Sequence, residues 1–321
     1  MDIQRLLNKI LGLALAFSVL LAVPAWAEQK VTFMLDWYPN PDHVPAYVAD
    51  QMGLFAKEGL KVEIMVPADP NDPMKLVAAG KIDFAISYQP SVLIARSEGL
   101  PIVSTGALIQ HPLSTILFLK SSGIKTPADL RGRTIGYSVE PLYRVLLEAV
   151  AEKGGLKPSD YKAVRVGFNL VPPLLGGKLD AVIGAFRNYE AIQVELEGKQ
   201  VGILPLEENG IPDFYELVII ANERTVKEQP ARVLAFMRAL SQGIDYTLGH
   251  AQQAFGVFLK AHPDLSDELN RRAFSVTLPY FKGSPLQDAA RWSAMQSFMK
   301  SRGLIKKETP VQAMIWQGPR K

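Results

Sequence analysis

Short apolar runs alternate with amphipathic segments along most of the chain, which is the pattern of strands followed by helices. This alternation predicts largely parallel sheets covered by helices on both faces. The predicted strands cover 31–35, 61–66, 102–109, 115–119, 133–139, 163–166 and 216–221, and the predicted helices cover 45–58, 73–79, 91–98 and 142–153.

Two ten-residue segments, 78–87 and 175–184, resemble each other. They share Gly, Lys, Asp and Ile at matching positions, and each predicts a helix end, a glycine stop and a short buried strand after the aspartate. Chance is the alternative explanation for four matches in ten. Each segment, however, also follows a predicted strand, 31–37 or 133–139, at a similar distance. The repeat therefore predicts two α/β lobes of like construction.

The chain from Pro230 onward is predicted to be mostly helical. Apolar residues recur at helical spacing over 233–244 and over 286–299, and Gly303 follows the second run. We interpret Trp292 and the methionines of these helices as packing residues rather than ligand contacts.

The first 27 residues have the features of a secretory signal peptide. Arg5 and Lys9 precede an uncharged run over 10–23, and small residues at Ala25 and Ala27 stand before Glu28. A bilayer span needs roughly 20 apolar residues, and this run is shorter. We predict a signal peptide at 1–27 and a periplasmic mature chain.

Composition argues against several classes of function. The 35 basic and 32 acidic residues nearly balance, without a long basic run, which argues against nucleic-acid binding. The 321 residues include no cysteine, and the four histidines lack the spacing of metal ligands. No Ser-His-Asp signature or phosphate loop is evident. We therefore predict no catalytic residue, no metal and no cofactor.

The segment 36–43 is the strongest candidate for a binding loop. It follows the first predicted strand, and its two prolines prevent the sheet ladder from continuing. Polar aromatic loops at strand ends are common ligand sites in α/β proteins. An ordinary turn before a helix is the alternative interpretation of this segment taken alone.

This segment resembles the Asp-Trp-x-Pro-Asn-x-x-His motif of the NMT1/THI5-like family. The similarity continues at Gly-Leu-Phe 53–55, Gly-Tyr-Ser 136–138 and Asn-Tyr-Glu 188–190. The resemblance implies a two-lobe type II periplasmic binding protein, or Venus flytrap, with a helical C-terminal part and ligand in the interlobe cleft. It implies one lobe from 28–115 plus 220–321 and another from 116–219.

Four loops at strand ends are expected to converge in that cleft. Trp37, Tyr88 and Tyr189 would stack on a flat ring, and Glu190 would accept from an amine and a protonated ring nitrogen. The alternatives are that Tyr88 and Tyr137 are core aromatics, that Ser138 caps a helix, and that Glu190 forms a surface salt bridge. The expected ligand-binding residues are Trp37, Asn40, His43, Tyr88, Tyr137, Ser138, Arg187, Asn188, Tyr189 and Glu190.

We predict a monomeric substrate-binding protein that carries a thiamine-precursor pyrimidine, formylaminopyrimidine or hydroxymethylpyrimidine, to an inner-membrane ABC permease. Arg187 leaves open an anionic cargo such as sulfonate or nitrate, and riboflavin is a further alternative. The resemblance also implies a third hypothesis, a thiamine-pyrimidine synthase. Because the enzymes of the family carry a cysteine-rich iron motif and this chain has no cysteine, we interpret His43 as a binding or hinge residue.

Overall fold

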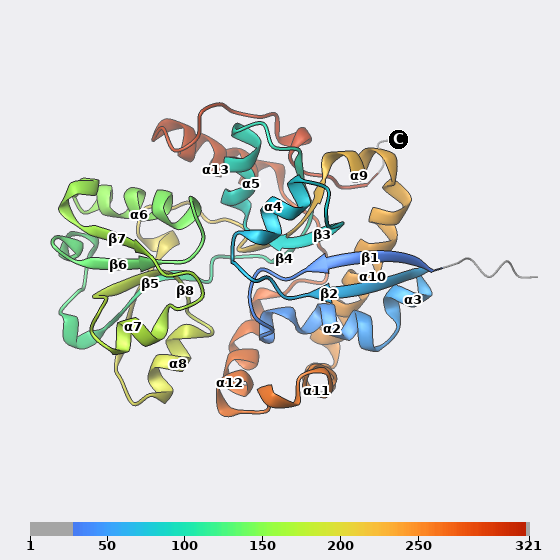
Figure 1. Ribbon diagram of the computed structural model, residues 1–321, viewed down its shortest axis with the longest axis horizontal. Coiled ribbons are helices and arrows are strands. Elements are labelled where there is room, and N and C mark those ends of the chain that lie inside the picture. Colours follow the sequence, from blue (N-terminus) through green and yellow to red (C-terminus); the bar gives the residue numbers. More distant parts are fainter. Residues whose placement is uncertain (1–27, 319–321) are drawn as a thin grey trace, which may run out of the picture.

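The computed structural model of the protein describes residues 28–318. The predicted signal peptide at 1–27 lies outside the described residues, as do residues 319–321. Figure 1 shows two separate sheets, each with helices packed around it. Within residues 28–318, no helix combines the length and the apolar character needed to cross a membrane.

The first sheet has five strands, and we call the part of the protein around it lobe 1. Four of its strands run in one direction, whereas β10 is antiparallel to both of its neighbours, β3 and β4. In spatial order the strands are β2 (Leu60–Met65), β1 (Gln29–Met34), β3 (Phe84–Ser87), β10 (Leu217–Asn222) and β4 (Ile102–Ile109).

The second sheet repeats this arrangement in lobe 2. Here β5 is the strand that runs antiparallel to its neighbours, β8 and β9. The order is β7 (Lys162–Arg165), β6 (Thr134–Tyr137), β8 (Ala181–Phe186), β5 (Ser114–Leu119) and β9 (Val201–Pro205). The predicted two-lobe α/β fold is confirmed, with one correction. Each sheet is mixed, because the chain inserts one antiparallel strand into it directly after crossing from the other lobe.

The helices also follow the predictions, with two corrections. The predicted helix 45–58 is two helices, because Gly53 has a left-handed φ of +66° that ends the first of them. Leu286 precedes the last helix and is exposed. The helices are α2 (Val44–Gln51), α3 (Leu54–Lys57), α4 (Asp72–Ala78), α5 (Gln89–Ser97), α6 (Leu142–Lys153), α7 (Val171–Leu175), α8 (Glu190–Leu196), α9 (Glu223–Glu228), α10 (Pro230–Gly249), α11 (Ala251–Ala261), α12 (Glu268–Thr277) and α13 (Ala289–Ser301).

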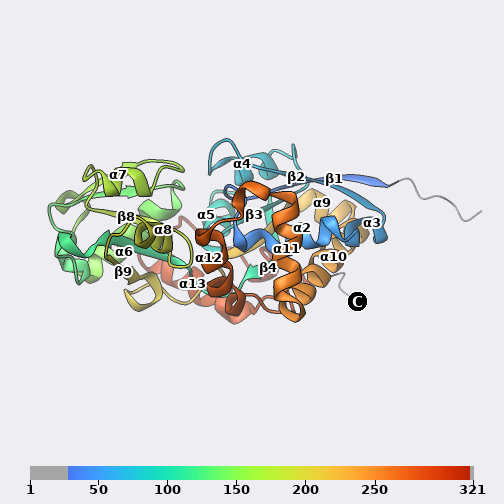
Figure 2. The same ribbon diagram turned by 90° about the horizontal axis from the view of Figure 1, so that it is seen from below.

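The C-terminal helices complete lobe 1 and reach lobe 2. Phe236 of α10 stacks on Phe84 at 4.2 Å and on Phe55 at 5.1 Å between ring centroids, so α10 is anchored in the core beneath the sheet. Trp292 is fully buried, as its interpretation as a packing residue requires. Helix α12 lies between the lobes and contacts α8 (Figure 2).

The repeated aspartates, Asp83 and Asp180, fix the central strands of the two sheets. Asp83 accepts hydrogen bonds from the backbone N–H of Thr32 at 2.8 Å and from its hydroxyl at 3.0 Å. Asp180 accepts from the backbone N–H of Thr134 at 2.8 Å. Asp83 therefore links the start of β3 to β1, and Asp180 links the start of β8 to β6. These equivalent contacts explain the sequence repeat.

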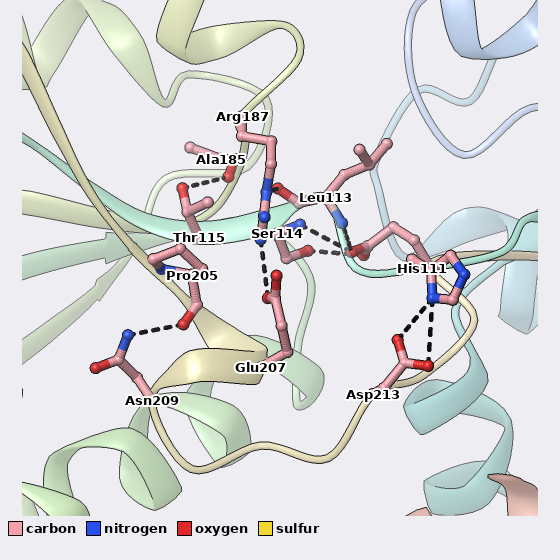
Figure 3. Close-up of polar contacts among 11 residues, drawn as sticks. His111, Leu113, Ser114, Thr115, Ala185, Arg187, Pro205, Glu207, Asn209 and Asp213 are labelled. Atoms are coloured by element: carbon pink, nitrogen blue, oxygen red, sulfur yellow. Dashed lines mark hydrogen bonds and ion pairs between the residues drawn. The ribbon is translucent and has the colours of Figure 1, made fainter. Parts of the chain in front are cut away.

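The chain crosses between the lobes twice, before β5 and before β10, and Glu216 joins the two crossings. Its carboxylate accepts from the backbone N–H groups of Leu113 at 2.7 Å and Ser114 at 2.8 Å, and from the Ser114 hydroxyl at 2.7 Å. Figure 3 shows the neighbouring ion pairs of these segments, Arg187 with Glu207 and His111 with Asp213. Because Glu216 is fully buried, its pKa is raised to about 7 despite these bonds.

Replacing Asp83 with alanine should destabilise the protein by about 1–3 kcal/mol, because the Thr32 N–H loses its acceptor. Urea unfolding followed by circular dichroism measures this change. Asp245→Ala, at an exposed position of α10, is the control and should change the free energy of unfolding by less than about 0.5 kcal/mol. Equal effects of the two substitutions would contradict the role given to Asp83.

Candidate functional site

A cavity lies between the two lobes. Six of the ten expected binding residues line it, and they come from both lobes. Asp36, Asp42, Gly184 and Phe186 also line it and were not expected. The six expected residues are Trp37, Asn40, Tyr88, Ser138, Tyr189 and Glu190.

Asp36 holds one wall of the cavity in place. One carboxylate oxygen lies 3.0 Å from His43 Nε2, and the other accepts from the Tyr88 hydroxyl at 2.9 Å. His43 Nδ1 accepts the backbone N–H of Asn40 at 3.2 Å, so the ring proton is on Nε2 and is donated to Asp36. His43 is fully buried behind the cavity and orients Asp36 rather than lining the site.

The loop that carries these groups is shaped by Asn40. Its side-chain oxygen accepts the Asp42 N–H at 2.9 Å and caps the short 3-10 helix Pro41–His43. Its amide nitrogen donates to the Tyr38 carbonyl at 3.1 Å. Strand β1 ends at Met34, before the prolines, and Asn40 turns the chain so that Asp36 and Asp42 both face the cavity.

Asp42 links the cavity wall to lobe 2. Its carboxylate accepts from the Asn188 amide at 2.7 Å and lies 3.2 Å from the Thr277 hydroxyl of α12. Burial raises the pKa of Asp42 to about 6, against the opposing effect of His43 and these hydrogen bonds. Asn188 does not line the cavity, and it acts in the structure as the lobe 2 partner of Asp42.

Glu190 faces the cavity from the first turn of α8. Its carboxylate accepts the Phe186 N–H at 2.8 Å, and its side chain is buried, so it does not form the surface salt bridge considered above. Burial raises its pKa to about 7, and the nearby carboxyl groups of Asp42 and Asp36 add to that rise. Glu190 can therefore exchange a proton with a ligand near neutral pH.

The remaining expected residues lie in different surroundings. Ser138 lines the cavity, and its hydroxyl makes no hydrogen bond to any residue of the described chain. The Tyr137 hydroxyl donates to Glu140 at 2.8 Å, and Tyr137 does not line the cavity. Arg187 donates to Glu207 at 2.8 Å beside the crossing segments, so the structure does not bring it to the cavity (Figure 3).

Aromatic side chains close one side of the site. Trp37 packs edge-on against Phe168 of lobe 2, with ring centroids 4.5 Å apart, and Tyr38 lies at the same distance from Phe168. Phe168 was not expected, because it lies in a loop between β7 and α7 and belongs to no recognisable motif.

The cavity is rich in acceptors and contains no basic side chain among its lining residues. Three carboxyl groups, Asp36, Asp42 and Glu190, contribute to its wall, and no Lys, Arg or His does. Residues 28–318 also contain no group of three His, Asp or Glu side chains placed to hold a metal ion. Such a site favours a ligand with several N–H donors or a positive charge over an anion.

Comparison with known proteins identifies the family. Residues 40–254 match the NMT1/THI5-like family, and the chain belongs to it. A protein of Haemophilus influenzae named for thiamine biosynthesis is 43% identical, covering 90% of this chain and 92% of that one. The formylaminopyrimidine-binding protein of Halalkalibacterium halodurans is 36% identical, covering 89% of each chain.

Other members of the family carry a different name. The 4-amino-5-hydroxymethyl-2-methylpyrimidine phosphate synthase of Legionella pneumophila is 32% identical, covering 87% of this chain and 88% of that one. Among solved structures, the periplasmic aliphatic sulphonate binding protein SsuA of Escherichia coli covers 91% of this chain and 94% of its own, with a TM-score of 0.67 and 17% identity. That likeness confirms the type II periplasmic binding protein fold.

The raised pKa of Glu190 predicts a pH-dependent stability. A carboxyl group whose pKa rises on folding binds more protons in the folded state, so its stabilising effect is lost as the pH rises through about 7. Glu190→Gln should unfold like the wild type at pH 5. At pH 8 it should be more stable by on the order of 2 kcal/mol. Urea unfolding of the ligand-free proteins between pH 5 and pH 8 measures the difference, and identical pH profiles would contradict it.

Proposed function

We propose that this protein is the substrate-binding protein of an ABC importer and that it binds a thiamine-precursor pyrimidine between its lobes. The acceptor-rich cavity carries this proposal, because an aminopyrimidine offers an exocyclic amine and a ring nitrogen that can be protonated. The name of the relative from Halalkalibacterium halodurans supports the same class of ligand. We propose formylaminopyrimidine or hydroxymethylpyrimidine as the cargo.

In the proposed complex the pyrimidine ring stacks in the aromatic part of the cavity. Trp37, Phe186 and Tyr189 supply ring faces or edges, each stacked face contributing roughly 1–3 kcal/mol by analogy with nucleobases. Glu190 accepts from the amine and from the protonated ring nitrogen, and Asp42 is placed to take a second donor. Stacking and charge-assisted bonds together suffice for the roughly −8 kcal/mol of micromolar affinity.

The anionic cargo considered from the sequence has little support in this geometry. Arg187, the residue on which that hypothesis rests, is paired with Glu207 and lies outside the lining of the cavity. An anion would face three carboxyl groups without a compensating cation, which is unfavourable in a buried site.

A pyrimidine synthase is the second candidate, and the relatives with that name favour it. We propose a binding role instead, because the chain contains no cysteine for the iron motif implied by the family resemblance. Histidine consumption with formation of a pyrimidine product, measured with iron and pyridoxal phosphate supplied, would support the synthase.

The proposal includes location and partners. We propose a periplasmic monomer that delivers its ligand to an inner-membrane permease. We also propose two lobes, 28–115 plus 220–321 and 116–219. The assignment of strands to the two sheets supports this division to within three residues, because β5 begins at Ser114 and β10 at Leu217. Lobe closure around the ligand would then present a surface formed by both lobes to the permease.

Calorimetric titration of the ligand-stripped protein tests the cargo. We expect micromolar or tighter binding of a thiamine-precursor pyrimidine and no binding of taurine or nitrate. Glu190→Gln should weaken pyrimidine binding roughly 10- to 100-fold, because it replaces a charge-assisted bond with a neutral one. Trp37→Ala should weaken it by a similar factor through lost stacking.

Glu197→Gln provides the matched control, because Glu197 is an exposed glutamate at the C-terminal end of the same helix, α8. It should leave the affinity within twofold. Tight binding of an anion together with no pyrimidine binding would refute the proposed cargo.

A further inference from the structure

The Ser138 hydroxyl is a buried polar group that the fold itself does not use. Ser138 is 1% exposed, and its Oγ has no hydrogen-bond partner among the described residues. It follows β6 and precedes α6, but α6 has no side-chain cap, so the hydroxyl does not serve the helix. A buried hydroxyl without a partner is destabilising, and such groups in native proteins often mark a functional contact.

The Tyr88 hydroxyl also lines the cavity, and it is already engaged. Tyr88 donates its proton to Asp36 at 2.9 Å, so this proton is not free for a ligand. The carboxyl groups of the cavity serve the donors of a ligand. Ser138 Oγ, which has no partner among the described residues, is thus available to donate to an acceptor atom of the ligand.

Ser138 lies where the ligand cavity meets a second one. The second cavity shares Asp36 and Tyr88 with the first. It is also lined by Val139 and Glu140, the two residues that directly follow Ser138. A ring held in the first cavity that extends a side arm toward the second would carry that arm past Ser138.

We infer that Ser138 determines specificity by donating a hydrogen bond to the acyl oxygen of the ligand's side arm. This inference rests on the proposed function and names the part of the ligand that Ser138 recognises. Formylaminopyrimidine has such an oxygen on its arm, whereas the deformylated aminomethyl pyrimidine has an ammonium group, which accepts no hydrogen bond. The affinity gained from the formyl oxygen should therefore depend on Ser138.

A cycle of two ligands and two proteins isolates this contact. Titration calorimetry of the wild type and of Ser138→Ala uses formylaminopyrimidine and its aminomethyl form. Ser138→Ala should weaken formylaminopyrimidine about tenfold and leave the Kd of the aminomethyl form within twofold. Equal weakening of both ligands, or weakening of neither, would overturn the inference.

Ser97→Ala is a control for the loss of a buried serine hydroxyl outside the site. Ser97 Oγ donates to the Ile94 carbonyl at 3.0 Å in α5, and Ser97 lines neither cavity. It should lower the Tm of the ligand-free protein and leave both Kd values within twofold. Ser138→Ala should leave that Tm unchanged or raise it, because it removes an unpaired hydroxyl. A lower ligand-free Tm for Ser138→Ala would show a structural role and overturn the inference.

The outcomes separate this inference from the proposed function. If the wild type binds formylaminopyrimidine but Ser138→Ala binds it equally well, the inference fails and the proposed function stands. If the wild type binds hydroxymethylpyrimidine but not formylaminopyrimidine, the inference fails and the proposed function stands. If it binds neither formylaminopyrimidine nor hydroxymethylpyrimidine, the proposed cargo fails and this inference fails with it.

Discussion

The carboxyl groups buried between the lobes are the constraint on which the site depends. Asp36, Asp42 and Glu190 approach one cavity from two lobes, and no basic side chain lines it. Asp36 is stabilised by two donors, His43 and Tyr88, and Asp42 by the Asn188 amide. Glu190 accepts the backbone N–H of Phe186, and burial raises its pKa to about 7. The site therefore requires a ligand that supplies donors or a proton.

The same constraint explains why the arginine of this region lies elsewhere. Arg187 belongs to the loop that also carries Asn188 and Glu190, yet its guanidinium points to Glu207 beside the crossing segments (Figure 3). There it lies near the buried Glu216, whose carboxylate ties the two crossings together, and it opposes the rise in the pKa of Glu216. Arg187 thus stabilises the crossing segments, and no basic side chain lines the cavity.

Local sequence patterns predicted most of the fold. Helix α6 and strand β4 occur at the predicted residues. The repeat around Asp83 and Asp180 correctly predicted two lobes of like construction, and their sheets have equivalent strand orders. Insertion of β5 and β10 as antiparallel strands was not predicted, because hydrophobic periodicity reports burial and not the direction of a partner strand.

The site was predicted less completely than the fold, for a related reason. Loops at strand ends were identified correctly as the source of lining residues, since six of the ten expected residues line the cavity. Which side chains face the cavity depends on contacts distant in sequence. Asp36 acquires its role from Tyr88, 52 residues away, and the Asp42–Asn188 bond spans 146 residues. No pattern in either loop specifies these partners.

These distant contacts also bear on how the lobes close. Contacts between the lobes include the Asp42–Asn188 hydrogen bond and the Asp69–Arg165 ion pair, whose atoms are 2.6 Å apart. The partly exposed pair Asp69–Arg165 contributes at most about 1 kcal/mol. Asp42 and Glu190 approach the cavity from the two lobes, and Asp42 adds to the raised pKa of Glu190, which opposes deprotonation of Glu190. The ion pair favours closed lobes, and the burial of neighbouring carboxyl groups opposes closure. We therefore expect the hydrogen-bond donors of a ligand to shift the equilibrium between open and closed lobes.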